Sequence, residues 1–354
     1  MMIRTRSIVA CRVAFLGPAL ALFLPACSWA CACGCGVFDV GANTAFPNQA
    51  DNGLSVWLRV SGMDQDRNWI GSSSAPAALN ADKRIRSVFY DIGAQYMVNH
   101  SWGVMFDLPY VARSFTTVGD GGPYPAGSIA TTKIAALGDL VIQGVYAGFS
   151  ADMSTGLTFG LKLPTGDYTG PYVGPNGLPP SDPRSTTGGM AYDRDTLPGT
   201  GSTDLVLGGY HFAALSGDAR WSYFAQARVQ VALQTRDGAT GSAAGAGYRP
   251  GNETILGAGL AWIAGEKDSY RVTPVMQVSW AVRGSDSGAA SSPNSGYRRL
   301  LVGPGIDLRS GPWRVFADVE LPAWQSVRTD VPGASSVGQL VARALWKFQL
   351  SHDF

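Results

Sequence analysis

The sequence has 354 residues, a formal net charge of +1, 45 glycines and only 15% charged residues. Charges of both signs are dispersed, so the sequence offers no polybasic surface for nucleic acid and no disordered acidic or basic tail. A chain of this length can form one large domain or two ordinary ones.

The first thirty residues have the pattern of an export signal. A basic opening precedes an apolar stretch at 13–24, and "SWA" at 28–30 matches a small-x-small cleavage site. We therefore predict a signal peptide over residues 1–30. Acylation of Cys27, the last residue of "LPAC", is an alternative. The apolar stretch is shorter than the roughly 20 residues of a transmembrane helix, and no later run comes close to that length.

Three cysteines follow the predicted cleavage site directly. The segment 31–53 carries Cys31, Cys33 and Cys35, and no cysteine occurs after Cys35. Stray thiols risk wrong disulfides in an oxidising compartment, which accounts for the cysteine-free remainder. Soft thiolates this close together suit Cu(I) or another thiophilic metal ion. The alternatives are one disulfide with a remaining thiol, an intermolecular bridge, or a lipid on Cys31.

Twelve segments after residue 53 alternate apolar and polar residues. In "LSVWLRV" at 54–60, for example, the leucines and valines share one face. A period of two is typical of a strand with one apolar face. The predicted strands are 54–60, 87–98, 102–111, 139–149, 156–164, 203–212, 220–233, 254–263, 270–282, 299–308, 313–322 and 340–354.

The connections between these strands alternate in length. Those after every second strand are short, whereas the others are long and rich in Gly, Ser and Pro, the longest covering 165–202. Short turns at one end and long loops at the other, with an even strand number, are typical of an outer-membrane barrel. We therefore predict an all-β fold, an antiparallel transmembrane β-barrel of about 12 strands over residues 54–354, with the N- and C-termini in the periplasm.

Aromatic residues support this topology at both the turns and the C-terminus. The last predicted strand ends at Phe354 with Trp346, Phe348 and Leu350 on the same face, which resembles the signal that outer-membrane barrels present to the barrel-assembly machinery. Other rings fall at the predicted periplasmic ends of strands, where they would form an interfacial girdle: Trp102, Trp221, Trp262, Tyr270 and Trp313.

The polar faces of the strands are predicted to line the interior. A charge facing lipid near the midplane would cost up to about 2–4 kcal/mol, so the alternation must place charges inside. The predicted interior residues are Arg59, Asp91, Asp107, Asp139, Lys162, Arg228, Glu253, Asp307, Asp318, Glu320, Arg343 and Lys347. They either fill a narrow barrel and fix its shape or line a path for a solute.

A short repeat occurs in three strands: "DLPY" at 107–110, "KLPT" at 162–165 and "ELPA" at 320–323. The prolines suit positions where strand pairing ends or bulges. Together with "PGTGSTDLVLG" at 198–208, these motifs resemble the outer-membrane barrel family named for the meta-pathway of phenol degradation, whose members are often labelled transporters. The resemblance covers most of residues 54–354 and implies transport of small solutes. The cysteine cluster is no part of that family's usual pattern.

The histidines argue against an enzyme. The chain has only His100, His211 and His352, and the predicted topology puts all three at periplasmic turns or strand ends. An outer-membrane phospholipase would need His paired with Ser near the outer leaflet, and a protease would need His with carboxylates in the outer loops. We therefore predict no catalytic residue and no enzymatic activity.

The sequence thus predicts a transporter or pore for small solutes, with aromatic compounds as candidates, in the outer membrane of a Gram-negative bacterium. Its expected partners are membrane lipid, the barrel-assembly machinery and the solute, and no nucleic acid. The periplasmic cysteines would bind Cu(I) or a similar ion. The alternative is a closed structural or metal-binding barrel without pore activity. Segment 165–202 either folds back as a constriction or stays a surface loop.

Overall fold

The computed structural model describes residues 53–118, 127–168, 197–215, 217, 219–235, 248–288, 294–329 and 337–354. Both the predicted signal peptide and the cysteine segment, apart from residue 53, lie outside these ranges. Regular structure in the described residues is almost entirely β-strand. None of the described helices is both long and apolar enough to cross a membrane.

The elements follow one another along a single sheet. Their bounds are β1 Leu54–Ile70, β2 Ser73–Ser74, the 3-10 turn η2 Ala77–Leu79, β3 Asp82–Met97, β4 Trp102–Val118, β5 Ile129–Leu137, β6 Leu140–Tyr146, β7 Thr155–Leu163, β8 Ser202–Ala214, β9 Trp221–Thr235, β10 Glu253–Trp262, β11 Gly265–Lys267, β12 Tyr270–Arg283, β13 Tyr297–Ser310, β14 Trp313–Val327 and β15 Gln339–Asp353.

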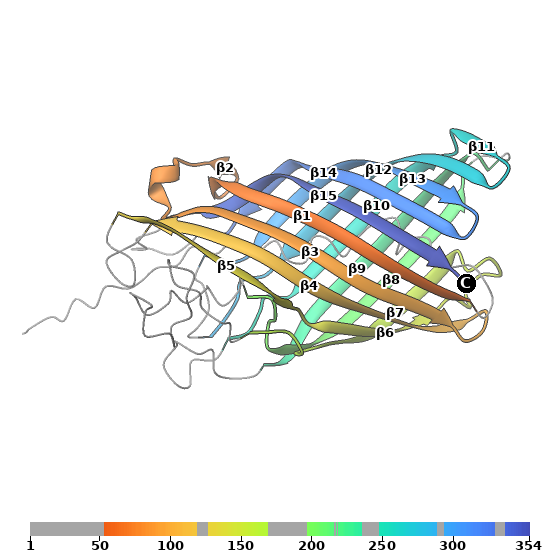
Figure 1. The fold of residues 1–354 in the computed structure, drawn as a ribbon, viewed down its shortest axis with the longest axis horizontal. Coiled ribbons are helices and arrows are strands. Elements are labelled where there is room, and N and C mark those ends of the chain that lie inside the picture. The colour runs from red at the N-terminus through yellow and green to blue at the C-terminus, as the bar shows by residue number, and fades with distance from the viewer. Residues whose placement is uncertain are drawn as a thin grey trace, which may run out of the picture.

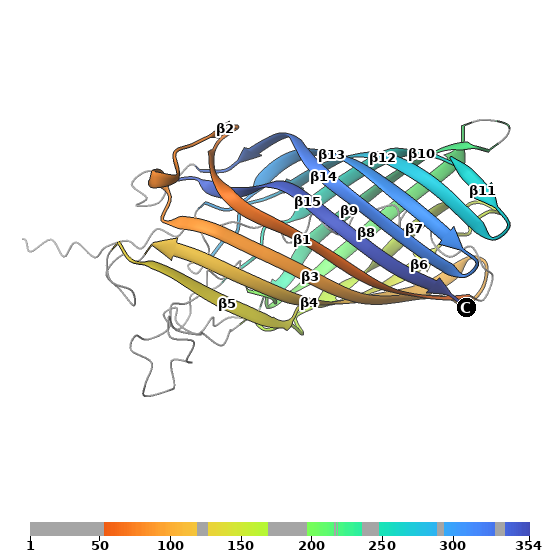
Figure 2. The same cartoon turned by 45° about the horizontal axis from the view of Figure 1, so that its top comes forward.

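The sheet closes on itself as an antiparallel barrel (Figures 1 and 2). Sequence neighbours pair throughout, and the first strand pairs with the last, with Leu58 opposite Leu350. Closure removes the two free ends that an open sheet would have, as a membrane-spanning sheet requires, although within the described residues β5 keeps one unpaired edge. The described residues make twelve crossings, because β2 and β11 are short extensions and β5 and β6 share one crossing. The predicted fold class is confirmed.

The outward surface carries an apolar band between two aromatic levels. On β12 the outward residues from Tyr270 to Trp280 are all uncharged. Ten residues of a tilted strand span about 25 Å, which is the height of the apolar band of an outer-membrane barrel. At one level Trp221 stacks on Trp262 with ring centroids 5.9 Å apart. At the other, Trp280 stacks on Trp324 at 5.6 Å. The chain is therefore an outer-membrane β-barrel.

The two ends of the barrel differ. Figure 1 shows the C-terminus and β11 at one end and β2 at the opposite end. The short turns are capped locally: Asn99 Oδ1 accepts hydrogen bonds from the backbone N–H groups of Ser101 and Trp102, both at 2.9 Å. In the next turn, hydrogen bonds from Ser154 hold the pKa of the Asp152 carboxyl below its ordinary value. Which end faces the periplasm stays a prediction.

One crossing of the barrel wall is interrupted. β5 pairs with residues 110–118 of β4, the half far from the short turns. β6 pairs with residues 102–107, the half next to the short turn. Only β6 continues the ladder to β7, where Leu140 lies opposite Leu163. Within the described ranges, β5 pairs with β4 alone. Gly138 and Asp139 form the break. Inward-facing side chains have even residue numbers in β5 and odd residue numbers in β6.

Candidate functional site: the barrel interior

Buried ion pairs line much of the interior, and the first joins β1, β3 and β4. Arg59 Nε lies 3.0 Å from an Asp91 carboxylate oxygen, and Arg59 Nη2 lies 3.1 Å from Asp107. Trp57 Nε1 donates a further hydrogen bond to Asp107 at 3.3 Å. Arg59 and Asp91 are buried. The three charged residues therefore pair with one another across neighbouring strands.

A second group surrounds the ammonium of Lys162 at the wall interruption. Lys162 Nζ lies 2.9 Å from Asp139 and 3.2 Å from Asp204. Asp139 also accepts hydrogen bonds from the backbone N–H of Thr200 at 2.8 Å and from its hydroxyl at 2.6 Å. Since all three charged side chains are buried, the polar groups here satisfy one another, as burial requires.

The same place anchors both ends of the long segment 165–202. Asp167 N–H donates to the Leu137 carbonyl at 3.1 Å, and Gly199 N–H donates to the Asp167 carbonyl at 2.8 Å. The backbones approach so closely that a Cβ added at Gly199 would lie 2.5 Å from the carbonyl carbon of Gly166. Only glycine, which lacks a Cβ, allows this contact. The residues between 168 and 197 lie outside the described ranges.

A third group pairs carboxylates of β14 with Lys347 of β15. Lys347 Nζ lies 3.8 Å from Asp318, and Gln277 donates a hydrogen bond to Asp318 as well as one to Glu320 at 3.3 Å. Ser279 Oγ donates to Glu320 at 3.3 Å. These side chains are buried, and among the described residues Asp318 Oδ1 has no hydrogen-bond partner, so this polar network is only partly satisfied.

The remaining predicted residues occupy other levels. Asp307 pairs with Arg314 near the short turns. Glu253 accepts a hydrogen bond from the Tyr297 hydroxyl at 2.8 Å. Arg228 is partly buried and donates to Gln230 at 3.0 Å. The interior charges are therefore spread along the barrel and paired near their own strands.

Arg343 differs from the prediction. Its side chain is 70% exposed and pairs with Asp66 at 3.4 Å. A register shift explains this position: Met63 faces Leu345, whereas Gln65 faces Ala342. The bulge on β15 reverses the alternation at Arg343. The interior assignment of Arg343 is therefore wrong.

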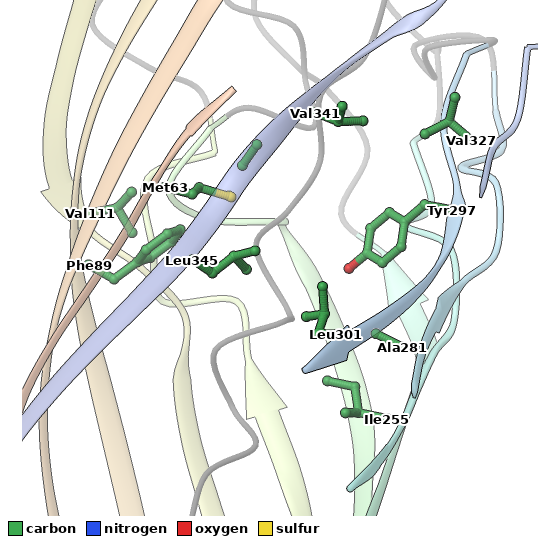
Figure 3. Close-up of a cluster of buried hydrophobic side chains, with 11 residues drawn as sticks. Met63, Phe89, Val111, Ile255, Ala281, Tyr297, Leu301, Val327, Val341 and Leu345 are labelled. Carbon is green, nitrogen blue, oxygen red and sulfur yellow. The ribbon is translucent and has the colours of Figure 1, made fainter. Parts of the chain in front are cut away.

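The interior also contains a cluster of buried apolar side chains that the sequence did not predict. We call it the apolar lining: Met63, Phe89, Val111, Ile255, Ala281, Tyr297, Leu301, Val327, Val341, Ala342 and Leu345, all buried. Figure 3 shows Met63, Phe89, Val111 and Leu345 on one group of strands and Ile255, Ala281, Leu301 and Tyr297 on another. Val111 lies opposite Ala136 of β5, beside the wall interruption.

A smaller apolar group lies on the inward side of β5. Leu197, at the end of the long segment, packs with Ile85, Phe115, Ile134 and Leu340, and all five are buried. The described end of the segment 165–202 therefore lies inside the barrel at Leu197, and the choice between a constriction and a surface loop stays a prediction.

The described histidines lie at the short-turn end. His211 contacts the Thr155 hydroxyl at 2.8 Å and the Tyr223 hydroxyl at 3.1 Å. The His352 ring lies 4.4 Å from that of Trp313. Hydroxyl and ring contacts of this kind fix side-chain orientation at strand ends.

Comparison with known proteins adds fold relatives but no family. No protein-family profile matches the chain, and no curated protein matches it. A solved outer-membrane channel from Pseudomonas putida F1 aligns over 87% of this chain and 99% of its own, with a TM-score of 0.59 and 10% identity. The β-domain of the Bordetella autotransporter BrkA aligns over 86% of this chain and all of its own, with a TM-score of 0.50 and 14% identity. Both show the barrel fold.

Proposed function

We propose that the chain is an outer-membrane transporter for small hydrophobic solutes, with aromatic compounds as candidates. The apolar lining carries this proposal, because the interior of a water-filled porin is polar. Here buried aliphatic and aromatic side chains from eight crossings share the interior with the ion pairs. Small-molecule sites in proteins combine such an apolar surface with a few fixed polar groups.

The wall interruption supports the same function. The apolar lining reaches it at Val111, and the Lys162 group fixes the chain ends around it. A hydrophobic solute entering from the loop end would meet the lining before it met the polar level at Lys347. The fold similarity to the channel from Pseudomonas putida and the resemblance of several motifs to those of the phenol meta-pathway barrels support transport over a purely structural role.

Uptake across vesicles with lipopolysaccharide in the outer leaflet tests the proposal, because that leaflet hinders unaided entry of apolar solutes. We expect Phe89→Asn and Leu301→Asn to slow uptake of a small aromatic hydrocarbon severalfold. Gln325→Asn, a buried polar position of the barrel outside the apolar lining, is the matched control and should keep normal uptake. Equal uptake by all three variants would reject the apolar path.

The cysteine cluster remains a separate proposal supported by the sequence. Cys31, Cys33 and Cys35 would bind Cu(I) or another thiophilic ion through thiolates. Titrating the reduced protein with Cu(I), beside a variant with all three changed to Ser, tests this directly. Equal copper uptake by the two proteins, or an acylated Cys31 in the mass spectrum, would end the metal assignment without affecting the transport proposal.

Recognition by the barrel-assembly machinery also remains a proposal. The Phe354 ring is exposed, and its backbone N–H donates to the Leu54 carbonyl at 2.8 Å, next to the closing strand pair. Deleting Phe354 should lower the amount of inserted barrel in cells. A Phe149→Ala variant, which removes another exposed ring at a turn, should insert normally.

A further inference from the structure

Basic side chains gather on the outward face of β3, β4 and β5, at the ends of these strands that lie far from the short turns. The three strands lie side by side in Figure 1. Arg86, Ser114 and Lys133 occupy one row across these three strands, and Asp64 of β1 lies opposite Arg86 in the same row. Arg84, Thr116 and Thr131 occupy the next row. We call these six residues the basic patch. Arg86 and Lys133 are exposed, and they face the same side as the apolar band.

Two of the three cations in the basic patch are available for a ligand. Arg84 is held by Asp64, whose carboxylate oxygens lie 2.8 and 3.1 Å from Arg84 Nε. Among the described residues, Arg86 and Lys133 have no hydrogen bond or ion pair to another side chain. Thr116 and Thr131 bring their hydroxyl oxygens within 2.8 Å of each other beside these cations.

The basic patch lies just beyond an aromatic level. Tyr90 and Tyr110 face outward as a cross-strand pair with ring centroids 6.5 Å apart. Arg86 is four residues farther along β3, which places it about 10 Å beyond Tyr90 along the barrel axis. That height corresponds to the polar headgroup region beside the hydrocarbon core.

We propose that the basic patch binds the phosphate groups of a phosphorylated glycolipid, lipopolysaccharide, in the outer leaflet. The proposal rests on the predicted orientation, with the long loops outside the cell, and not on the transported solute. Charge complementarity selects the ligand: Arg86 and Lys133, which have no ionic partner in the described part of the chain, face the layer in which that lipid carries its phosphates. Cations near such an anionic surface contribute favourably to binding.

The geometry suits phosphate recognition. Two strand spacings separate Arg86 from Lys133 by about 10 Å at the backbone, and both long side chains can reach a group lying over Ser114. A guanidinium donates paired hydrogen bonds to phosphate, while an ammonium acts as a compact charge. Hydroxyl groups of Ser114 and Thr116 can donate to the remaining oxygens.

Binding of lipopolysaccharide to the purified barrel in neutral detergent tests the proposal. We expect Arg86→Gln with Lys133→Gln to weaken binding by about tenfold for each cation removed. The control pair Arg220→Gln with Lys267→Gln removes equal charge at the short-turn end, where both residues are exposed. It should bind like the wild type, as should Arg86→Lys with Lys133→Arg, which keeps both charges.

Two further ligands separate the sources of phosphate. The wild type should bind dephosphorylated lipopolysaccharide weakly, with the affinity that the double glutamine variant has for intact lipopolysaccharide. Inorganic phosphate should compete only weakly with intact lipopolysaccharide for the wild type. Unchanged binding by the double glutamine variant, equal binding of the dephosphorylated lipid, or full competition by inorganic phosphate would each overturn the proposal. Heat-modifiable migration of every variant confirms that a loss of binding is not a loss of folding.

Discussion

The Lys162 ammonium lies 2.9 Å from the Asp139 carboxylate and so joins β7 to the break between β5 and β6. Asp204 lies 3.2 Å away on the other side. The cation therefore neutralises two buried carboxylates at the break between β5 and β6, where the strand pairing of the wall is interrupted.

Lys162→Met should destabilise the barrel by about 3–5 kcal/mol, because it leaves two buried carboxylates without their cation. Denaturant unfolding of the refolded protein measures the loss. The triple change Lys162→Met, Asp139→Asn and Asp204→Asn removes the buried charges together and should recover part of the stability. A triple variant less stable than Lys162→Met alone would contradict the role assigned to Lys162.

Arg59 and Arg343 should respond differently to removal. Arg59→Ala leaves Asp91 and Asp107 without their partner inside the barrel, so we expect a loss of about 3–5 kcal/mol. Arg343→Ala should change the free energy of unfolding little, because exposed pairs are screened by solvent. Similar unfolding curves for the two variants would contradict the different placements of these arginines.

Gly199→Ala should impair folding. The added methyl group would overlap the Gly166 backbone, which cannot move away without disturbing the break at Gly138. Gly265→Ala is the matched control, since a Cβ at Gly265 meets nothing within 4 Å. The yield of heat-modifiable barrel on refolding gives the comparison, and an equal yield for both variants would contradict the close contact.

The orientation of the barrel can be read from single cysteines. In a chain with Cys31, Cys33 and Cys35 changed to Ser, we expect Ser74→Cys to react with a membrane-impermeant maleimide on intact cells. Lys267→Cys, at the short-turn end, should react only after permeabilisation. Both parent residues are exposed, so the labelling pattern reports which end is outside. The reverse pattern would put the termini outside the cell.

Strand membership was predictable where the barrel crosses the membrane, because lipid on one side and a polar interior on the other enforce alternation. Beyond the aromatic levels the outward face is polar and the inward face mixes polar and apolar residues, so this signal is lost. The prediction for β1 stopped at residue 60, whereas the strand continues to Ile70 past the outward-facing Asp64 and Asp66. β5 was missed for the same reason, since Thr131 and Lys133 occupy its outward face.

The sequence pointed to interior charges but not to the apolar lining. Arg59, Asp91 and Lys162 interrupt apolar runs and thus stand out in the sequence. Phe89 and Val111 instead lie inward beside outward-facing aromatic neighbours, so the local sequence reads as apolar on both faces. Such runs inside an otherwise alternating strand are the signal that could have identified the apolar lining. The bulge that turns Arg343 outward leaves no comparable pattern.

Uptake by the wild-type barrel tests the central claim most directly. Vesicles with lipopolysaccharide in the outer leaflet are prepared with and without the protein, and entry of a small aromatic hydrocarbon is followed beside entry of a sugar of similar size. The account predicts that the barrel speeds entry of the hydrocarbon far more than entry of the sugar. Equal acceleration of both solutes, or no acceleration of the hydrocarbon, would contradict it.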